Sequence, residues 1–396
     1  MANIIDYAEH TFYSLTEQSL GAVDSLILSQ FSYLNLPKER IAAGGMQVRD
    51  LLCAELFDGM LARTRVPAEN LRLLVAMAAS PRFRTMQLVD FTDCRDAVQE
   101  EQFAAVTLRI DPHTLYVAFR GTDATFLGWK EDFNMAFCDT VPSQQQAAAY
   151  LDEIASREDG NIITGGHSKG GNLALYAAAM CHASTRKRVI AAYCHDGPGF
   201  REDVFSKEGF HEIEPIVQKT VPQSSIIGMV FESHEAYHIV HSDNKSIMQH
   251  DPYSWTVQDG DFLYEPRLSA GAIYTNRTIA NWIAQLSDEE RELLVNTMYR
   301  QLNGGDLERI KDFGQNWREN TLAVITSVHN TNADVREAIS EMLKKLMVQM
   351  VENSAPRAGI ATVQREAIVA KNKLTVVGKR IASRVKDGRK KPVRVR

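Results

Sequence analysis

A serine between two glycines is the residue of this sequence best suited to chemistry. Ser168 lies in Gly166-His167-Ser168-Lys169-Gly170, which matches the pattern G-x-S-x-G. A short apolar stretch precedes it and a helix-forming stretch follows it, so the serine falls on a strand-to-helix turn. Such a sharp turn needs glycine on both sides, and it exposes the serine oxygen at a helix N-terminus that favours developing negative charge. The motif predicts a nucleophilic serine, with Gly166 and Gly170 as the glycines of its turn; a plain turn is the alternative.

A general base for this serine must lie on a loop after the last strand, free to reach the serine oxygen. In enzymes with this turn, the serine comes first in the chain, then an acid, then a histidine. His238 and His241 fall inside a predicted strand, whereas His250 falls on the loop after it. We therefore predict His250 as the base, with His234 as the next candidate. His167, within the turn, is expected to pack beneath it.

The acid is predicted from its place in the sheet. Asp196 follows the first strand after the serine, and catalytic groups gather at the C-terminal ends of parallel strands. The alternative is that Asp196 only braces the turn Asp-Gly-Pro-Gly, a frequent role of aspartate. Glu232 is the reserve acid, together with Glu235. Asp251, directly before a proline, is expected to be a turn residue.

Strands and helices alternate between about residues 102 and 242, which predicts an α/β fold with a mostly parallel sheet. Strands are expected over residues 102–110, 115–121, 161–166, 188–197, 224–231 and 237–242. The first two flank Asp111-Pro112-His113 and should form an antiparallel hairpin. A helix is expected from Ser143 to about Arg157. Residues 1–95 are predicted to be mostly helical, and no strand is expected beyond Trp255.

Composition narrows the class of protein. The 396 residues carry a formal net charge of −6, which argues against a chain built to hold nucleic acid. No apolar run reaches the ~18 residues of a membrane span, and the N-terminus lacks the pattern of a signal peptide. The five cysteines show no C-x-x-C spacing, which is typical of reduced thiols and argues against a disulfide framework or a zinc site. We expect a cytoplasmic protein that needs no metal or organic cofactor.

The C-terminal end has a separate composition. From Lys371 onward there are eleven Lys or Arg residues and one acid, Asp387. This is typical of a solvated, disordered basic tail; contact with an anionic surface is the alternative, and sequence-specific binding of nucleic acid is not expected.

Several ordered motifs carry a resemblance to known proteins. LYVAFRGTD followed by IITGGHSKGGNLALYAA is similar to the core of the class 3 lipases, which have F-R-G-T and then G-H-S-L-G-G-A. DSLILSQFSYL, VAFRGTD, GHSKGGNLA, DGPGF, SSIIGM and QHDPYSW together resemble a bacterial lipase-like family, known only as a domain of unknown function. The resemblance runs from about residue 19 to about 300. It implies an α/β-hydrolase fold, and it also selects His250.

The resemblance also implies an oxyanion hole. One donor is the N–H of Lys169, and the lipase pattern implies Thr122 as the second, in the loop after an early strand. Lys169 replaces the leucine that is usual in lipases, and we expect its side chain to point to solvent. Arg120 and Asp123 are expected to form an ion pair that ties this loop together.

We divide the chain into three parts. An N-terminal helical segment (1–95) should pack on an α/β-hydrolase domain (96–305), and a helical extension (306–396) ends in the basic tail. The predicted function is a serine hydrolase that cleaves a carboxylic ester or related acyl bond of a small molecule or lipid through an acyl-enzyme. A peptidase or amidase is an alternative. A catalytically silent binding protein is another, because class 3 lipases place their acid where this chain has Ser224 and Ser225. Substrate identity and oligomeric state stay open.

Overall fold

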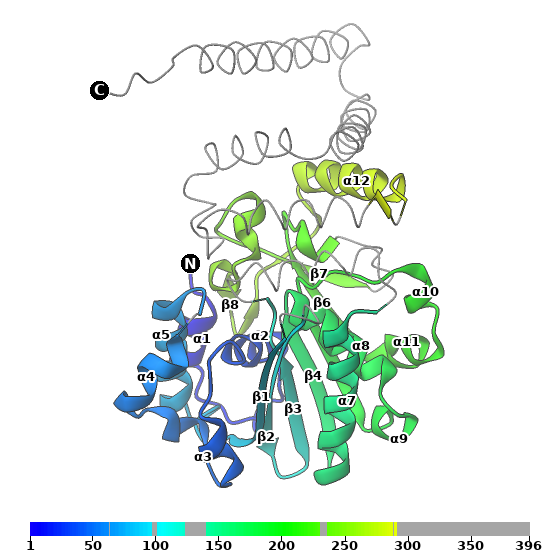
Figure 1. Cartoon of the computed structure of the whole chain (residues 1–396). Coiled ribbons are helices and arrows are strands. Elements are labelled where there is room, and N and C mark those ends of the chain that lie inside the picture. Colours follow the sequence, from blue (N-terminus) through cyan, green and yellow to red (C-terminus); the bar gives the residue numbers. More distant parts are fainter. Residues whose placement is uncertain (63, 97–100, 123–139, 230–235, 288, 291–396) are drawn as a thin grey trace, which may run out of the picture.

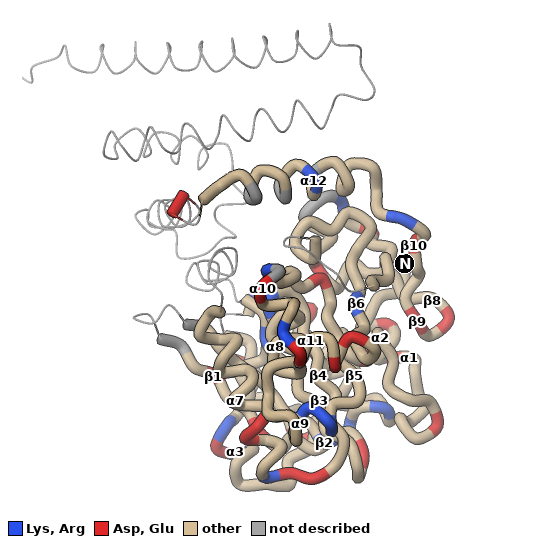
Figure 2. Tube along the Cα trace, turned by 90° about the vertical axis from the view of Figure 1, so that its right-hand side faces the viewer, with Lys and Arg blue, Asp and Glu red and all other residues tan. Residues whose placement is uncertain are grey.

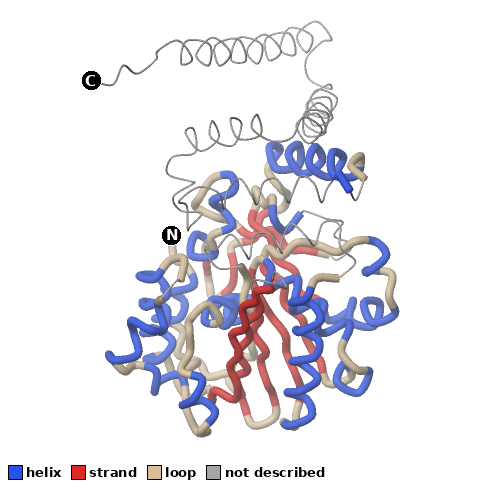
Figure 3. Tube along the Cα trace, in the orientation of Figure 1, coloured by secondary structure: helices blue, strands red, loops and turns tan. Residues whose placement is uncertain are grey.

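An eight-stranded sheet runs through the centre of the molecule, and helices cover both of its faces (Figures 1 and 3). The computed structural model describes residues 1–62, 64–96, 101–122, 140–229, 236–287 and 289–290. The strand order is β1-β2-β3-β4-β5-β6-β7-β10. The sheet comprises β1 (Gln87–Asp96), β2 (Glu101–Asp111), β3 (Thr114–Phe119), β4 (Asn161–His167), β5 (Val189–His195), β6 (Val217–Pro222), β7 (Tyr237–Val240) and β10 (Tyr264–Glu265).

The five strands β3 to β7 are parallel to their neighbours, whereas β1, β2 and β10 pair antiparallel at the two edges. A separate two-stranded ribbon joins β8 (Val257–Gln258) to β9 (Asp261–Phe262). This mostly parallel sheet between two helical layers is an α/β-hydrolase fold, as the sequence predicts.

The two faces of the sheet belong to separate apolar clusters. Along β3, Tyr116 and Ala118 pack with the N-terminal helices, whereas Leu115 and Val117 pack with later helices, because successive side chains of a strand point to opposite faces. The first layer contains α1 (Ile4–His10), α2 (Ala22–Phe31), α3 (Lys38–Ala42), α4 (Ala54–Leu61) and α5 (Pro67–Ala79). The second contains α7 (Pro142–Arg157), α8 (Lys169–Met180), α9 (Ala183–Arg186), α10 (Glu202–Phe205) and α11 (Glu208–Ile213).

One further helix, α12 (Ala270–Ala284), lies across the end of the sheet (Figures 1 and 2). Asn276 of this helix donates a hydrogen bond to the Ser225 carbonyl, 3.0 Å away, in the loop after β6. The fold also contains short 3₁₀ helices, namely η1 (Val48–Leu51), η2 (Glu214–Ile216), η3 (Ile227–Met229), η4 (Ser246–His250) and η5 (Pro252–Ser254). Within the described ranges, no helix has the length and hydrophobicity that a membrane crossing requires.

Most of the predicted strands are confirmed, including the β2–β3 hairpin. The strand expected over 224–231 is wrong: β6 lies at Val217–Pro222, and the stretch after it forms a loop with η3. The apolar pattern of the sequence did not reveal β6, because this strand carries the polar residues Lys219 and Thr220, both of which are buried.

The expectation of helices up to residue 95 is also wrong, since β1 occupies Gln87–Asp96. Its sequence QLVDFTDCRD is polar at many positions because it is an edge strand. Strands also continue beyond Trp255, as β8, β9 and β10, each two residues long and too short to show a periodicity. The division into three parts stays a prediction, and the extension over 306–396 lies outside the described residues.

A buried ion pair fixes the N-terminal segment. Arg82 Nε and Nη2 each lie 2.6 Å from an oxygen of the Asp24 carboxylate, and both side chains are almost fully buried. The remaining N–H groups of Arg82 donate to backbone carbonyls of Tyr13, Gln18 and Ser19. The loop between α1 and α2 therefore wraps around one guanidinium group.

Replacing this arginine should be costly. Arg82→Met leaves the Asp24 carboxylate buried without its counter-charge, which should lower the free energy of unfolding by about 3–5 kcal/mol. Urea unfolding followed by circular dichroism measures this. The exposed Arg84→Met is the matched control and should change that free energy by less than about 0.5 kcal/mol. Equal unfolding midpoints for the two variants would show that the pair contributes little.

Candidate active site

The serine turn is built from close backbone contacts. Ser168 stands between β4 and α8 with φ 60° and ψ −134°, a conformation that L-residues rarely adopt. A Cβ atom on Gly166 would lie 2.1 Å from the backbone of Gly170, and a Cβ on Gly170 would lie 2.1 Å from the carbonyl oxygen of Phe119. Both positions therefore need glycine. The turn holds the serine oxygen at the N-terminus of α8.

The structure brings Ser168, His250 and Asp196 together. Nε2 of His250 lies 2.9 Å from Ser168 Oγ, and Nδ1 lies 2.6 Å from Asp196 Oδ2. Because a carboxylate only accepts hydrogen bonds, Nδ1 carries the proton and the Nε2 lone pair faces the serine hydroxyl. This arrangement can take a proton from Ser168.

The carboxylate of Asp196 is fully buried and held on both oxygens. While Oδ2 accepts from His250, Oδ1 accepts from the Ser225 hydroxyl and from the Gly228 N–H at 3.1 Å. Asp196 has φ 50°, and its N–H donates to the carbonyl of Thr220 on β6 at 2.8 Å. The loop where class 3 lipases were expected to place the acid thus supplies Ser225, which holds the Asp196 carboxylate.

The loop after β3 lies against the serine. A Cβ on Gly121 would be 3.2 Å from Ser168 Cβ and 2.6 Å from the His167 carbonyl, so the backbone of Gly121, directly before Thr122, passes beside Ser168. Lys169 follows the serine as the first residue of α8. Thr122 and Lys169 are the two residues predicted as oxyanion donors.

Two charged side chains near this loop, Lys169 and Arg120, are both buried. The expectation that Lys169 points to solvent is wrong: the residue is buried, and its Nζ donates to the carbonyl of Gln102 on β2 at 2.8 Å. The first turn of α8 packs against the sheet, so the side chain of Lys169 lies in the protein interior. Arg120 pairs with Asp93 of β1 at 2.7 Å. Asp123, the predicted partner, lies outside the described residues, as do Glu232, Glu235 and His234.

Comparison with known proteins identifies the family. Residues 77–300, more than half of the chain, match the Mbeg1-like family. The chain belongs to the Mbeg1-like family. The relation to class 3 lipases stays a prediction.

Solved structures similar to this Mbeg1-like chain are lipases of low identity. The Rhizomucor miehei lipase–propeptide complex has 15% identity and a TM-score of 0.30, over 43% of this chain and 66% of that chain, slightly less than two thirds of its length. A fungal lipase–inhibitor complex has 15% identity and a TM-score of 0.30, over 48% and 82%. M37 lipase has 12% identity and a TM-score of 0.33, over 60% and 82%. No curated protein sequence matches the chain.

A second histidine supports His250 in the Mbeg1-like protein. His167 Nε2 lies 2.9 Å from the His250 carbonyl, and the two rings lie against each other at an interplanar angle of 33°, with centroids 4.6 Å apart. Since a carbonyl only accepts, Nε2 carries the proton, and Nδ1 accepts from the hydroxyl of Tyr33 at 3.4 Å. Burial, followed by the nearby His250 and His195, lowers the pKa of His167 well below its ordinary value, so the ring is neutral.

Sequence reasoning placed His167 beneath the turn but missed Tyr33 and the contact with His250. No local signal marks this contact, because Tyr33 and His250 are far apart in the sequence. In the part of the chain that the structure describes, no group of three or more His, Cys, Asp or Glu residues is arranged to hold a metal ion.

His195, directly before Asp196, is buried in a polar chain. Its Nδ1 lies 2.7 Å from the Thr220 hydroxyl and its Nε2 lies 2.9 Å from the Ser25 hydroxyl of α2. Burial lowers the pKa of His195 to about 3. The end of β5 that carries Asp196 is therefore tied both to β6 and to the N-terminal layer.

These two neutral histidines should make stability depend on pH. An unfolded histidine has its ordinary pKa near 6.5. The stability from burying neutral His195 is therefore complete above about pH 6.5 and is lost as pH falls toward the folded value of about 3. Between pH 6 and 4.5, His195→Gln should reduce the slope of unfolding free energy against pH by about 1.4 kcal/mol per pH unit. His167→Gln should reduce the slope in the same direction, and urea unfolding across this range measures both. Slopes identical to the unsubstituted protein would contradict neutral burial.

Proposed function

We propose that this Mbeg1-like protein is a serine hydrolase that cleaves a carboxylic ester or a related acyl bond. The observation that carries the proposal is the continuous row of hydrogen bonds from Asp196 through His250 to Ser168. The close-packed turn at Ser168 adds support, since strained backbone at one partly buried serine hydroxyl is typical of a nucleophile.

The chemistry follows from the arrangement. His250 takes the proton from Ser168 as Oγ attacks the acyl carbonyl, and Asp196 stabilises the imidazolium that forms. The N–H groups of Lys169 and Thr122 stabilise the negative oxygen. His250 then gives its proton to the departing alcohol, which leaves an acyl group on Ser168. Water, activated by the same histidine, releases the acid and restores the serine. Every step uses the protein's own side chains and backbone.

The sequence leaves two other functions open. A peptidase or amidase would use the same three residues, and the geometry does not separate it from an esterase. The main argument for a catalytically silent binding protein is the lack of an acid at Ser224 and Ser225. This argument is weakened, because Ser225 instead holds the carboxylate of Asp196, which comes from the neighbouring strand end. We further propose that the substrate is a small acyl ester or lipid, that the protein is cytoplasmic, and that its basic C-terminal end is a solvated tail, with contact to an anionic surface as the alternative.

A fluorophosphonate probe tests the proposed nucleophile directly. The unsubstituted protein should become labelled, and Ser168→Ala should abolish labelling. His250→Ala and Asp196→Asn should slow it by about 10³- to 10⁴-fold, because the base is lost or held in the wrong tautomer. Ser224→Ala is the matched control, since its hydroxyl bonds Ser269 and not the three residues of the row. Folded protein that never labels would favour a silent binding protein.

His167 should act as a positioning residue for His250. His167→Phe keeps an aromatic ring but removes the N–H that donates to the His250 carbonyl, and should slow labelling about 5- to 10-fold. His167→Gln retains an N–H donor and should recover part of the rate. The pH at which labelling reaches half its maximum should move in His167→Phe, because the ring in contact with His250 is then no longer polar. Equal rates and unchanged pH profiles in both variants would leave His167 with a packing role alone.

A further inference from the structure

The acid and the base of the serine site come from separate segments of the chain. Asp196 follows β5, whereas His250 ends the short 3₁₀ helix η4. Nδ1 of His250 lies 2.6 Å from the Asp196 carboxylate, while Nε2 lies 2.9 Å from Ser168 Oγ. A misplacement of about 1 Å in such an arrangement can lower a rate by about 10²-fold. The position of η4 relative to Asp196 therefore matters for the chemistry.

Gln249, directly before His250, fixes this position. The residue is only 4% exposed, and both polar atoms of its side-chain amide are hydrogen-bonded. Oε1 accepts from the backbone N–H of Ser224 at 2.6 Å, and Nε2 donates to the carbonyl of Asn244 at 2.8 Å. The backbone carbonyl of Gln249 also accepts from Nε1 of the buried Trp255 at 2.8 Å. The amide of Gln249 therefore joins η4 to the loop that follows β6.

The same loop holds the acid. Ser225, the residue after Ser224, donates its hydroxyl proton to Asp196 Oδ1, and the N–H of Gly228 donates to the same oxygen at 3.1 Å. A Cβ atom on Gly228 would collide with Asp196 Oδ1, so the loop and the carboxylate are in direct contact. The loop after β6 is thus bonded to the acid on one side and to the segment of the base on the other.

These contacts form a closed ring that contains both the acid and the base. Four side chains take part, namely those of His250, Gln249, Ser225 and Asp196. Ser224 contributes only its backbone N–H, which an alanine at this position would also supply. Helix α12 steadies the ring from outside, through the 3.0 Å hydrogen bond from Asn276 to the carbonyl of Ser225. Because the ring is closed, the loop after β6 sets the carboxylate and the backbone next to the imidazole together.

One of the two amide bonds of Gln249 reaches far along the chain. Asn244 is five residues before Gln249, so the bond to its carbonyl only closes the turn itself. Ser224 is 25 residues before Gln249, so the other bond joins two separate segments. Burying an amide costs free energy unless it is hydrogen-bonded, and an apolar side chain would fill the same space without this cost. The junction between the two segments therefore explains why a glutamine stands here.

We propose that Gln249 is a positioning residue of the site. It holds the segment that carries His250 against the loop that holds the Asp196 carboxylate, and so sets the hydrogen bond between imidazole and carboxylate. The effect of Gln249 on reaction rate rests on the proposed serine hydrolase function. Its effect on the hydrogen bond of His250 does not depend on that function.

Gln249→Met keeps the length of the side chain but removes both amide bonds. The maximum rate of fluorophosphonate labelling per folded molecule should fall about 10-fold, because His250 is misaligned. The probe concentration that gives half this rate should change by less than about twofold, since probe binding is not affected. The pH of half-maximal labelling should move to lower pH, because a base farther from the carboxylate holds its proton less strongly. Asn276→Leu, which loosens the same loop from α12, should slow labelling about threefold.

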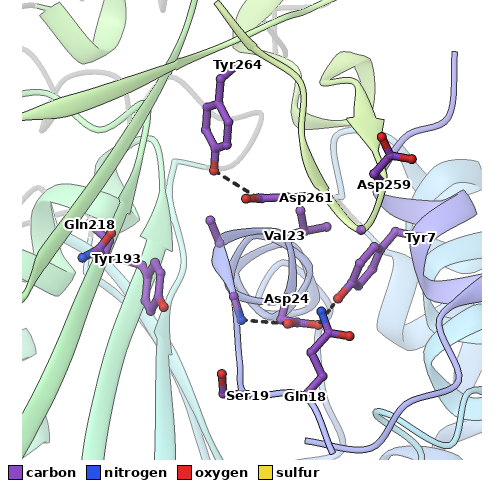
Figure 4. A pocket seen from close by; sticks show the side chains of 13 residues that line it. Tyr7, Gln18, Ser19, Val23, Asp24, Tyr193, Gln218, Asp259, Asp261 and Tyr264 are labelled. Carbon is purple, nitrogen blue, oxygen red and sulfur yellow. Dashed lines mark hydrogen bonds between the residues drawn. The ribbon is translucent and has the colours of Figure 1, made fainter.

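Gln218→Met is the matched control. Gln218 is exposed on β6 and lines a separate pocket, to which none of the four side chains of the ring contributes (Figure 4). Its labelling rate and pH profile should equal those of the unsubstituted protein.

Proton NMR gives a second readout that needs no catalysis. The Nδ1 proton of His250, in its charge-assisted bond to Asp196, should resonate at low field and disappear in Asp196→Asn. This signal should move to higher field in Gln249→Met and stay unchanged in Gln218→Met. A protein that never labels, but whose signal moves in Gln249→Met, would keep the positioning role and lose the hydrolase function. Labelling rates, pH profiles and signals that are equal in Gln249→Met and Gln218→Met would overturn the positioning role and leave the hydrolase function intact.

Discussion

The close approach of α8 to β3 is the constraint on which the site depends. The backbone of Gly170 meets the carbonyl of Phe119 with no room for a side chain, and Gly166 meets Gly170 in the same way. These contacts bring the helix N-terminus to the edge of the sheet and force Ser168 into positive φ. The same approach sets Gly121 beside the serine and buries the side chain of Lys169. The position of Ser168, that of the loop at Gly121 and that of the N-terminus of α8 thus share one geometric origin.

Near Ser168, the ends of two neighbouring strands supply different parts of the site. Asp196 follows β5 and provides the carboxylate, while the loop after β6 provides Ser225 and Gly228 to hold it. A carboxylate that is fully buried needs hydrogen bonds to its charged form, and each oxygen of Asp196 has one or more. The acid can therefore stand on a different strand from the one expected for class 3 lipases and still reach His250.

Local pattern was enough for the central features of this molecule. The turn at Ser168 is encoded within a few residues, and the strand ends that carry Asp196 and precede His250 follow from chain order. The hydrophobic pattern failed to predict strands where polar residues are buried or where the strand is very short. β6 hides Lys219 and Thr220, and β8 to β10 are too short for any period to show. The contact of Tyr33 with His167 joins distant segments, so no single stretch of sequence contains it.

Residues of the N-terminal layer, which precede the range matched by the family, take part in the hydrogen bonds of the site. The match to the Mbeg1-like family begins at residue 77, yet Ser25 and Tyr33 come before it and touch both buried histidines of the site. Asp24, beside them, is joined to Arg82 within the matched range. The border drawn by sequence similarity therefore cuts through one hydrogen-bonded assembly. Substitutions in this layer can therefore alter the hydrogen bonds of His167 and His195 without touching Ser168, His250 or Asp196.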